Sequence, residues 1–463
     1  MSEEMKTLHK QLLRDSRSGY DVLEEAQLRQ MEDYCADYKA FLGNKTERLS
    51  ARAAIAAAEA HGFVEYRRGM ALEAGDKVYT CNRGKGLMLA VMGRESMAEG
   101  VQIAAAHIDS PRLDLKPNPL YEDSELAYFK THYYGGIRKY QWVTIPLQLQ
   151  GVVVKKDGTA VEVCIGEKGE PQLVITDLLP HLGGEQGKKR LSEAIPAETL
   201  NILLGSRPIG DEDDSDRVKL HVMKRLYDKY GITEADFASA ELEAVPAADA
   251  VDIGIDGSMI GSYGHDDRVC GYAALRALLE LDAPAKTAVC VLADKEEIGS
   301  MGVTGMQSAV FETFLSDLCD SQNVPLKVCF ENSFCLSADV TAAYDPNFAD
   351  VFDKKNAAFL NHGVGLCKYT GARGKSGSSD AGAETVAYVR SLLDGAGVRW
   401  QICELGKVDA GGGGTVAQYM ANRNIATLDA GVPVLSMHAP FEVVAKLDCY
   451  EMYRACKAIY EAR

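Results

Sequence analysis

The sequence lacks any long apolar run. No stretch reaches the roughly 18 consecutive apolar residues that a membrane-spanning helix requires. Residues 1–15, MSEEMKTLHKQLLRD, are charged and amphipathic, and they lack the apolar centre of a secretory signal peptide. We therefore expect neither a membrane-spanning helix nor a secretion signal.

The sequence also lacks a Cys-x-x-Cys pattern, although it contains 12 cysteines. Cys290, Cys329 and Cys335 lie in apolar runs that are typical of buried strands. In a chain without a secretion signal, such cysteines are better interpreted as reduced thiols than as disulfides. The pattern therefore favours a cytoplasmic location.

Positive charge is scarce. The chain has 50 Lys and Arg against 67 Asp and Glu, which gives a formal net charge of −17. Because such a chain repels phosphate groups, we expect neither nucleic acid nor an anionic membrane as a partner. The glycines at 411–414 precede a helical pattern, but no GxGxxG or GK(S/T) pattern occurs. We interpret them as a loop that lines a substrate site.

The length and the texture of the chain indicate more than one domain. A chain of 463 residues exceeds one ordinary core, since domains average about 150 residues. Residues 18–61 have a helical pattern, strand-like runs follow, and strands alternate with helices from about residue 250. One strand is expected over 327–339. This alternation is typical of an α/β sheet with helices on both faces.

The middle of the chain has a different texture. Residues 145–175 alternate apolar and polar residues around an Asp-Gly turn, which predicts antiparallel hairpins. An acidic run at 210–216 is expected to be an exposed loop. We therefore expect one α/β domain made of residues 1–115 and 250–463, interrupted by a mostly-β domain over residues 116–249.

Five short segments each place a metal-binding side chain after an apolar run or at a helix start. They contain His107, Asp266, the pair Glu296 and Glu297, Asp339, and His438. All except the segment of Asp266 follow strand-like runs. In open α/β sheets, ligands bind outside the carboxyl ends of the strands. We therefore expect these four segments to meet at the same edge of one sheet.

The first two segments have ordinary interpretations as well. His107 could be a surface histidine, and Asp109 could form the turn before Pro111. Residues i and i+2 of a strand point the same way, so Asp109 could instead orient the imidazole of a metal-binding His107. Asp266 could bridge two cations or simply complement the dipole of the helix that it begins.

The other segments are equally ambiguous when taken singly. Glu296 and Glu297 could form an exposed acidic turn, or one could bind metal while the other takes a proton from water. Asp339 follows an apolar run, where an ionised carboxylate needs a cation or hydrogen bonds. A lone His438 is more often structural. Two histidines and three carboxylates suit Zn²⁺, Co²⁺ or Mn²⁺ better than Ca²⁺.

Six motifs, spread over nearly the whole chain, match a known family in order. They are HIDSPRLDLKP, YYGGIRKYQW, GHDDRVCGYAAL, DKEEIGS, SADVTAAYDPN and SMHAPFE. The chain thus resembles the M18 family of metallo-aminopeptidases, the aspartyl aminopeptidase family. Lys295 and residues 142–145 depart from the eukaryotic pattern and resemble the bacterial branch. These departures leave open whether the first residue of the substrate is acidic.

The resemblance implies a mixed-sheet catalytic domain like that of zinc exopeptidases, and it implies roles for individual residues. Two divalent ions, Zn²⁺ in the first place and otherwise Co²⁺ or Mn²⁺, would activate a shared water for attack on the N-terminal peptide bond of a peptide substrate. Asp109 would orient a ligand, and Glu296 would be the general base. The implied metal ligands are His107, Asp266 as the bridge, Glu297, Asp339 and His438.

The resemblance also implies an assembly. Family members form tetrahedral dodecamers from dimers, with the inserted domain pairing the subunits. His181, in the LLPHL segment of the insert, would reach the active site of a neighbouring subunit. Lys368, Tyr369, Arg373 and Lys375 lie in a Gly/Ser-rich stretch that could meet an acidic substrate side chain or form a solvated loop.

Two rival functions remain open from the sequence. One is another two-metal amide hydrolase, either a different dodecameric aminopeptidase or a deacylase. The other is a scaffold that assembles into a shell and uses metals only structurally. Intact Asp109 and Glu296 favour an enzyme over the scaffold.

Overall fold

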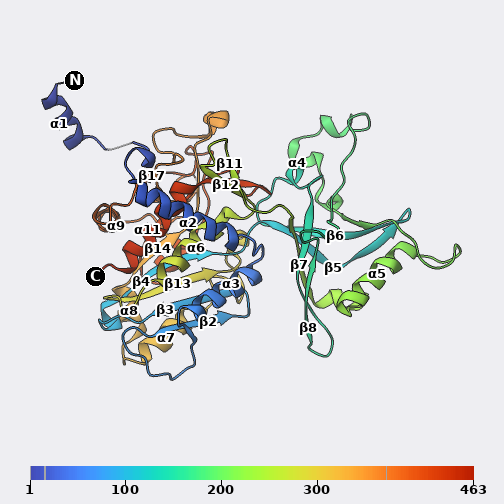
Figure 1. Ribbon diagram of the computed structural model, residues 1–463, viewed down its shortest axis with the longest axis horizontal. Helices are drawn as coiled ribbons and strands as arrows, with labels where there is room; N and C mark the ends of the chain where they lie inside the picture. Colours follow the sequence, from blue (N-terminus) through green and yellow to red (C-terminus); the bar gives the residue numbers. More distant parts are fainter. Residues whose placement is uncertain (1, 15–16, 372) are drawn as a thin grey trace.

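A nine-stranded mixed sheet forms the centre of the larger lobe (Figure 1). The computed structural model describes residues 2–14, 17–371 and 373–463. In spatial order the strands are β1 (Val64–Glu65), β2 (Lys77–Asn82), β3 (Gly86–Val91), β13 (Thr287–Ala293), β4 (Val101–His107), β14 (Phe334–Ala338), β18 (Ala426–Gly431), β16 (Val364–Cys367) and β17 (Trp400–Ile402).

The central strands are apolar along their whole length because helices cover both faces of the sheet. Every residue of β4, β13 and β14 is buried. In β4, Ala104 and Ala106 belong to one core cluster, whereas Ile103 and Ala105 belong to the other. This alternation is that of a strand whose two faces are both buried. The predicted α/β architecture is confirmed.

Two groups of helices supply these two cores. The first group packs around the core of Ala104 and contains α2 (Glu25–Phe41), α3 (Glu47–Ala60), α6 (His265–Leu279), α9 (Ala383–Gly395) and α11 (Lys446–Tyr460). The second group packs around the core of Ile103 and contains α7 (Val310–Asp320), α8 (Leu326–Glu331) and α10 (Ala417–Ala421).

Helix α8 corrects one prediction. The sequence favoured a single strand over residues 327–339, but only β14 is a strand, and Cys329 lies in α8. Pro325 precedes the helix, where its missing N–H costs no hydrogen bond. Phe330 then stacks on Phe311 of α7, with ring centroids 5.9 Å apart. Tertiary packing, rather than the apolar pattern, therefore decides the structure of this segment.

A six-stranded antiparallel sheet forms a second lobe, which projects from the first in Figure 1. Helix α5 (Arg217–Tyr230) packs on it, and the side chain of Trp142 is fully buried in its core. Of the antiparallel hairpins predicted over residues 145–175, the one formed by β7 and β8 is present. In spatial order the strands are β8 (Ala160–Ile165), β7 (Leu147–Val154), β10 (Ala240–Pro246), β5 (Arg112–Asp123), β6 (Leu126–Tyr134) and β9 (Ile202–Gly205). The exact division at residues 115 and 249 stays a prediction.

A five-stranded sheet lies beside the nine-stranded one. Its strands, in order, are β11 (Val251–Ile253), β12 (Met259–Ser262), β20 (Glu442–Ala445), β19 (Pro433–Leu435) and β15 (Thr341–Ala342). Two further helices are α1 (Glu3–Leu12) and α4 (Leu191–Ala194). Only one residue separates β18 from β19, so the chain passes directly from the nine-stranded sheet into the five-stranded sheet.

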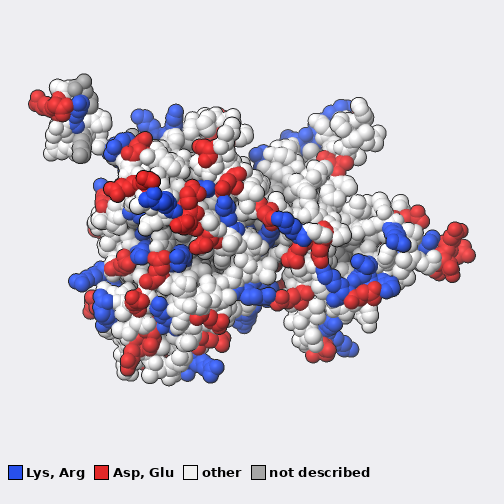
Figure 2. Space-filling model, viewed as in Figure 1, with Lys and Arg blue, Asp and Glu red and all other residues white. Residues whose placement is uncertain are grey.

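The surface carries both signs of charge. Figure 2 shows Lys and Arg interspersed with Asp and Glu over the visible face, and an acidic group at the far end of the second lobe. The residues at 210–216 are exposed, as predicted for this acidic run. No described helix combines the length and the apolar character needed to span a membrane. All 12 cysteines lie in described residues and are free.

Candidate metal centre

Three parallel neighbouring strands deliver candidate ligands to one edge of the central sheet. β4 lies between β13 and β14 and is parallel to both. His107 is the last residue of β4, Glu296 and Glu297 begin a 3₁₀ helix (Glu296–Ile298) after β13, and Asp339 follows β14. The prediction that strand ends bring these segments together holds for these three.

His438 reaches the same place by another route, which corrects the prediction for the fourth segment. It follows β19, a strand of the five-stranded sheet, and not a strand of the central sheet. Its Nε2 nevertheless lies 3.2 Å from Oδ2 of Asp266 and 3.6 Å from Oε2 of Glu297. The site is therefore built where two sheets meet.

The imidazole of His107 is held so that Nε2 faces the site. Its Nδ1 lies 3.0 Å from the main-chain oxygen of Asp109 and 3.3 Å from the Oδ1 of the same residue. Both oxygens can only accept, so Nδ1 carries the hydrogen and Nε2 of the neutral ring keeps a lone pair. This is the tautomer that a metal-binding histidine needs.

His438 is oriented in the same way by a different partner. Its Nδ1 lies 2.9 Å from the main-chain oxygen of Gly136, which belongs to the Tyr-Gly-Gly stretch after β6. The carbonyl accepts a hydrogen from Nδ1, and the lone pair of Nε2 therefore points towards Asp266. The sequence pointed to the Tyr-Gly-Gly stretch but not to this contact.

Asp266 lies between the two histidines. Its Oδ1 is 3.2 Å from Nε2 of His107, and its Oδ2 is 3.2 Å from Nε2 of His438. A lone pair facing a carboxylate oxygen at this distance is repulsive unless a proton or a cation lies between them. One carboxylate therefore presents one oxygen to each of two possible cation positions.

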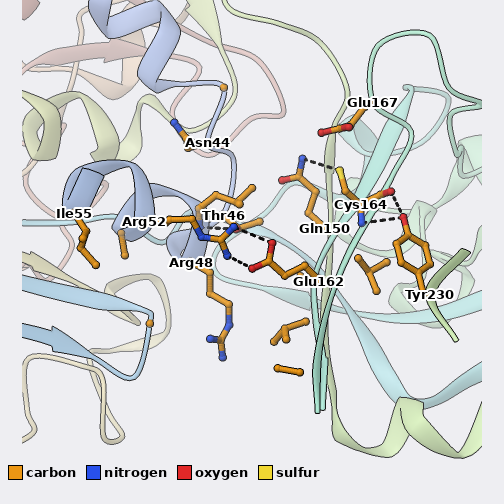
Figure 3. Close-up of a pocket in the computed structure, with 18 of the residues that line it drawn as sticks. Asn44, Thr46, Arg48, Arg52, Ile55, Gln150, Glu162, Cys164, Glu167 and Tyr230 are labelled. Carbon is orange, nitrogen blue, oxygen red and sulfur yellow. Dashed lines mark hydrogen bonds and ion pairs between the residues drawn. The ribbon is translucent and has the colours of Figure 1, made fainter. Parts of the chain in front are cut away.

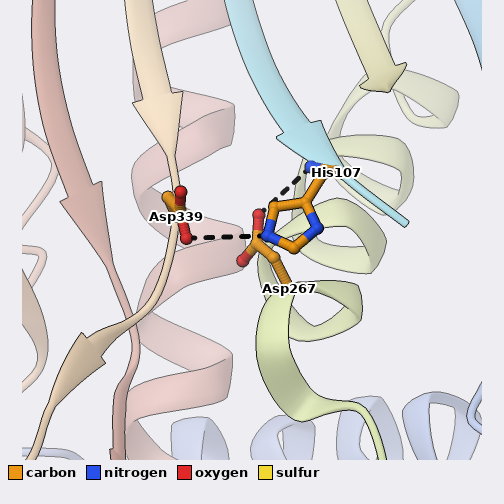
Figure 4. A group of neighbouring side chains, drawn as sticks. All are labelled: His107, Asp267 and Asp339. Atoms are coloured by element: carbon orange, nitrogen blue, oxygen red, sulfur yellow. Dashed lines mark hydrogen bonds and ion pairs between the residues drawn. The ribbon is translucent and has the colours of Figure 1, made fainter. Parts of the chain in front are cut away.

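Asp339 completes the group on the His107 side. Its Oδ1 lies 3.9 Å from Nε2 of His107. Figure 4 shows these two side chains together with the neighbouring Asp267. The Oδ2 of Asp267 accepts a hydrogen bond from the main-chain N–H of His107 at 3.3 Å. Because Asp267 is occupied in this way, Asp266 is the better partner for a cation beside His107 and Asp339.

Asp109 holds the other side of the site together. Its Oδ1 accepts a hydrogen bond from the main-chain N–H of Glu296 at 3.1 Å, and its Oδ2 accepts one from that of Glu297 at 3.2 Å. The hydroxyl of Tyr134 donates to the same Oδ2 at 2.8 Å. Asp109 thus fixes one histidine and the turn that carries both glutamates.

Glu442 holds the second histidine in a similar way, although its sequence position did not predict this contact. Its Oε1 accepts a hydrogen bond from the main-chain N–H of His438 at 2.7 Å, and its Oε2 accepts one from that of Asp266 at 3.1 Å. Glu442 is buried, and burial raises its pKa to about 8. It ends the SMHAPFE motif, which was the only available signal.

The buried carboxylates of the site lack enough positive charge nearby to balance them when no cation is bound. Burial raises the pKa of Glu297 and Asp339 well above their usual range and that of Glu296 to about 7. Oε1 of Glu297 is buried and has no hydrogen-bond partner among the described residues. Crowded buried carboxylates and two imidazole lone pairs fit divalent cations of the zinc type.

A cavity of about 460 Å³ opens onto these side chains. Asp266, Glu296, Glu297, Asp339 and His438 lie along it. The glycines at 412–414 form part of its wall, which agrees with their interpretation as a substrate-lining loop. The site is therefore open to a small molecule or to the end of a chain.

A larger cavity, of about 990 Å³, lies between α3 and the hairpin of β7 and β8 (Figure 3). Two ion pairs join charged side chains of its wall, Arg52 with Glu162 and Lys229 with Glu170, and Arg48 pairs with Glu241. The main-chain N–H of Cys164 donates to the hydroxyl of Tyr230. It lacks the cluster of candidate metal ligands that lines the smaller cavity, so the smaller cavity is the better candidate for the active site.

His181 lies apart from this cavity. It is exposed in the segment between β8 and α4, and it does not line the cavity in its own chain.

Comparison with known proteins then decides the family. The family model "Aminopeptidase I zinc metalloprotease (M18)" matches residues 44–460. The chain belongs to the M18 family. The resemblance inferred from the motifs is confirmed, and the protein is a metallo-aminopeptidase that uses a divalent metal.

Bacterial M18 proteins are similar over almost the whole chain. The "Probable M18 family aminopeptidase 1" of Clostridium acetobutylicum is 48% identical, with 95% of this chain and 97% of that protein covered. The crystal structure of the Thermotoga maritima M18 aminopeptidase superposes with a TM-score of 0.93 at 42% identity, with 97% and 99% covered. The Clostridium acetobutylicum aminopeptidase I structure gives 0.92 at 44%, with 97% and 100% covered.

Proposed function

We propose that this M18 aminopeptidase works with two divalent ions that share Asp266. The observation that carries the proposal is that each oxygen of Asp266 lies 3.2 Å from the Nε2 of a different histidine. Asp339 adds an oxygen on the side of His107, and Glu297 adds one on the side of His438. These groups are mixed N and O donors, for which Zn²⁺ is the first candidate and Co²⁺ or Mn²⁺ the alternatives.

Bound ions would polarise the carbonyl of the first peptide bond and lower the pKa of the attacking water molecule. Glu296 lines the cavity, and its Oε2 lies 3.8 Å from Nε2 of His107 without binding it directly. Glu296 is therefore the general base that takes a proton from the water. It then gives that proton to the leaving amine. Asp109 acts through others, because it positions His107 and the main chain of both glutamates.

The test of the base is Glu296→Gln. Glutamine keeps the size of the side chain but cannot take a proton, so kcat for aminoacyl anilides should fall roughly 10²–10⁴-fold. Metal content, measured by elemental analysis, should not change. Glu331→Gln is the matched control, since Glu331 is exposed at the end of α8. A Glu296→Gln protein that binds its metals and keeps the normal kcat would refute the role.

Two assays distinguish the rival functions: a panel of substrates, and a turnover assay of the metal-loaded protein. A panel of aminoacyl compounds against N-acyl compounds distinguishes a peptidase from a deacylase, because only the former needs a free α-amine. A metal-loaded protein that turns over neither class, even with added Co²⁺, would instead support a structural role for the metals. We expect turnover of aminoacyl compounds only.

We also propose a homo-oligomer in which the second lobe pairs subunits and His181 enters a neighbouring active site. A structure of the Saccharomyces cerevisiae protein mApe1, 21% identical, is described as a dodecamer. On this chain, Leu178, Leu179 and Leu182 are exposed around His181, and such apolar clusters are typical of contact surfaces. Light scattering should give the mass of twelve chains, and Leu182→Asp should lower it. A monomer in the wild type would contradict the proposal.

A further inference from the structure

Arg112 is buried where the second lobe meets the first. It is the first residue of β5, and only 4% of its surface is exposed. Tyr134 is its direct partner on β6, so the two side chains lie next to each other on one face of the sheet. The guanidinium carbon lies over the ring of Tyr134, 3.9 Å from its centroid. The ring of Tyr134 therefore rests against a buried charge.

Carboxylates from both lobes hold this guanidinium. Its Nη1 lies 3.3 Å from Oε2 of Glu47, the first residue of α3 in the first lobe. Its Nε lies 3.3 Å from Oε2 of Glu243 in β10 and donates a hydrogen bond to Oδ1 of Asp114 at 2.8 Å. A planar guanidinium can contact carboxylates with its edge while its face lies on an aromatic ring, which the ammonium group of lysine cannot do.

The two buried carboxylates depend on Arg112 because they have few other partners. Among the described residues, neither oxygen of Glu47 has a hydrogen-bond partner, and Oε2 of Glu243 has none either. Lys85, in the turn between β2 and β3, is the other buried cation of the group, with Nζ 3.7 Å from Oε1 of Glu47 and 3.0 Å from Oε1 of Glu241. Since a buried charge without a partner is strongly unfavourable, these ion pairs fix the position of the guanidinium.

Tyr134 connects this fixed group to the metal centre. Its hydroxyl donates to Oδ2 of Asp109 at 2.8 Å, and Asp109 accepts hydrogen bonds from the main-chain N–H groups of Glu296 and Glu297. The hydrogen bonds and ion pairs that Arg112 forms with described residues go to the carboxylates beside it, and none goes to Asp109. The chain of contacts from Arg112 to the two glutamates therefore runs through the ring of Tyr134.

We propose that Arg112 is a positioning residue for the aminopeptidase reaction. Its guanidinium fixes the ring of Tyr134, and the hydroxyl of Tyr134 then fixes Asp109 and the turn that carries Glu296. The inference rests on the function proposed above, because it assumes that the placement of Glu296 limits the rate. Small displacements of a catalytic group lower the rate strongly, so loss of the ring contact should lower kcat more than it changes KM.

Arg112→Lys tests the ring contact. Lysine keeps the positive charge but cannot lie on the ring and contact both buried carboxylates at once. With the metal-replete protein and an aminoacyl p-nitroanilide, we expect kcat to fall roughly 10-fold, with little change in KM. Lys85→Met is the matched control, because it removes the other buried cation of the group and leaves Arg112 and Tyr134 in place. It should lower Tm and leave kcat unchanged.

A double-mutant cycle separates positioning from a general loss of structure. If Arg112 acts through the hydroxyl of Tyr134, then Arg112→Lys should cause no further loss of kcat in a Tyr134→Phe protein. Losses that multiply would overturn the inference, as would a normal kcat in Arg112→Lys or equal losses in Arg112→Lys and Lys85→Met. A wild-type protein that hydrolyses no aminoacyl anilide would instead overturn the proposed function, so the two failures are distinguishable.

A second pair of proteins answers the same question if Arg112→Lys does not fold. Glu47→Gln/Glu243→Gln removes the two buried carboxylates that Arg112 balances. Adding Arg112→Met to this protein then removes the cation without leaving those two charges unpaired. We expect kcat of the triple variant to be roughly 10-fold below that of the double variant. Equal values of kcat would overturn the inference.

Discussion

At the scale of single residues, the proposed catalytic set depends on side chains that would touch neither substrate nor metal. Asp109 accepts hydrogen bonds from two main-chain N–H groups and from the hydroxyl of Tyr134. Burial raises the pKa of Tyr134, so its hydroxyl keeps the hydrogen that it donates. The guanidinium carbon of Arg112 lies over the same ring, 3.9 Å from its centroid, in a cation–π contact. Positioning groups of this kind matter almost as much as the ligands that they hold.

Tyr134→Phe tests this support. The change removes one hydrogen bond to Asp109 and keeps the ring, so kcat/KM should fall roughly 10-fold, within the range known for outer-shell partners of metal ligands. Tyr133→Phe is the matched control, because the side chain of Tyr133 is exposed. The rates of both variants with a leucine anilide, together with their metal content, decide the matter. Equal effects of the two changes would show that Tyr134 does not position the site.

Glu442 offers a second test at this scale. In Glu442→Gln one of the two accepting oxygens becomes an NH₂ group, which cannot accept from the main chain of His438 or Asp266. We expect the affinity for the metals to fall roughly 10–100-fold. Competition with a chromogenic chelator measures the change. A metal affinity equal to that of the wild type would show that His438 and Asp266 keep their positions without the hydrogen bonds to Glu442.

At the scale of elements, strand ends and one glycine-rich loop shape the cavity. β13, β4 and β14 run parallel and bring their carboxyl ends to one edge. The loop at 411–414 closes the wall, and it is anchored where the hydroxyl of Thr415 donates to Asp429 of β18 at 2.7 Å. The sheet thus fixes the positions of the candidate metal ligands. The loop limits the size of the cavity that is available to a substrate.

Two glycines of this loop form a matched pair. A Cβ on Gly411 would lie 1.7 Å from the main-chain oxygen of Leu405, whereas on Gly413 it would meet only Cδ2 of Leu405 at 3.6 Å. Gly411→Ala must therefore displace the loop, and we expect kcat/KM to fall at least about tenfold, since small displacements of positioning groups are costly. Gly413→Ala should change it far less. Metal content should stay constant in both, and equal rates would show that the loop does not shape the site.

At the scale of the whole molecule, the metal centre joins two sheets and the segment that follows β6. His107 ends a strand of the central sheet, and His438 lies between β19 and β20 of the five-stranded sheet. Gly136, which orients His438, follows a strand of the second lobe. Cations bound here therefore link parts of the chain that are distant in sequence, and they should stabilise the folded state of the whole protein.

Removal of the metals tests that link. Ligands that bind only the folded state contribute about 2.7 kcal/mol when their free concentration is 100 times Kd. Dialysis against a chelator should therefore lower Tm, and Zn²⁺ should restore it. The double variant His107→Ala/His438→Ala should show no response to Zn²⁺. A Tm that ignores the metal in the wild type would contradict the expected linkage.

Much of this structure was predictable from local pattern. The apolar runs of β4, β13 and β14 are buried on both faces, and such runs have few alternatives to a central strand. Residues 327–331 show where that reasoning failed. Their apolar residues suit a strand or a helix equally, and packing of Phe330 on Phe311 chose the helix.

The sequence by itself determined the chemical types of the candidate ligands and their place after apolar runs, because those depend on neighbouring residues alone. Only the tertiary structure decided how they meet. His438 arrives from a second sheet and is oriented by Gly136, a residue 302 positions away. Glu442 accepts hydrogen bonds from main-chain N–H groups, and the wall of the cavity comes from segments that are far apart in the chain. Such contacts depend on the path of the whole chain, and a pattern of neighbouring residues in the sequence cannot predict them.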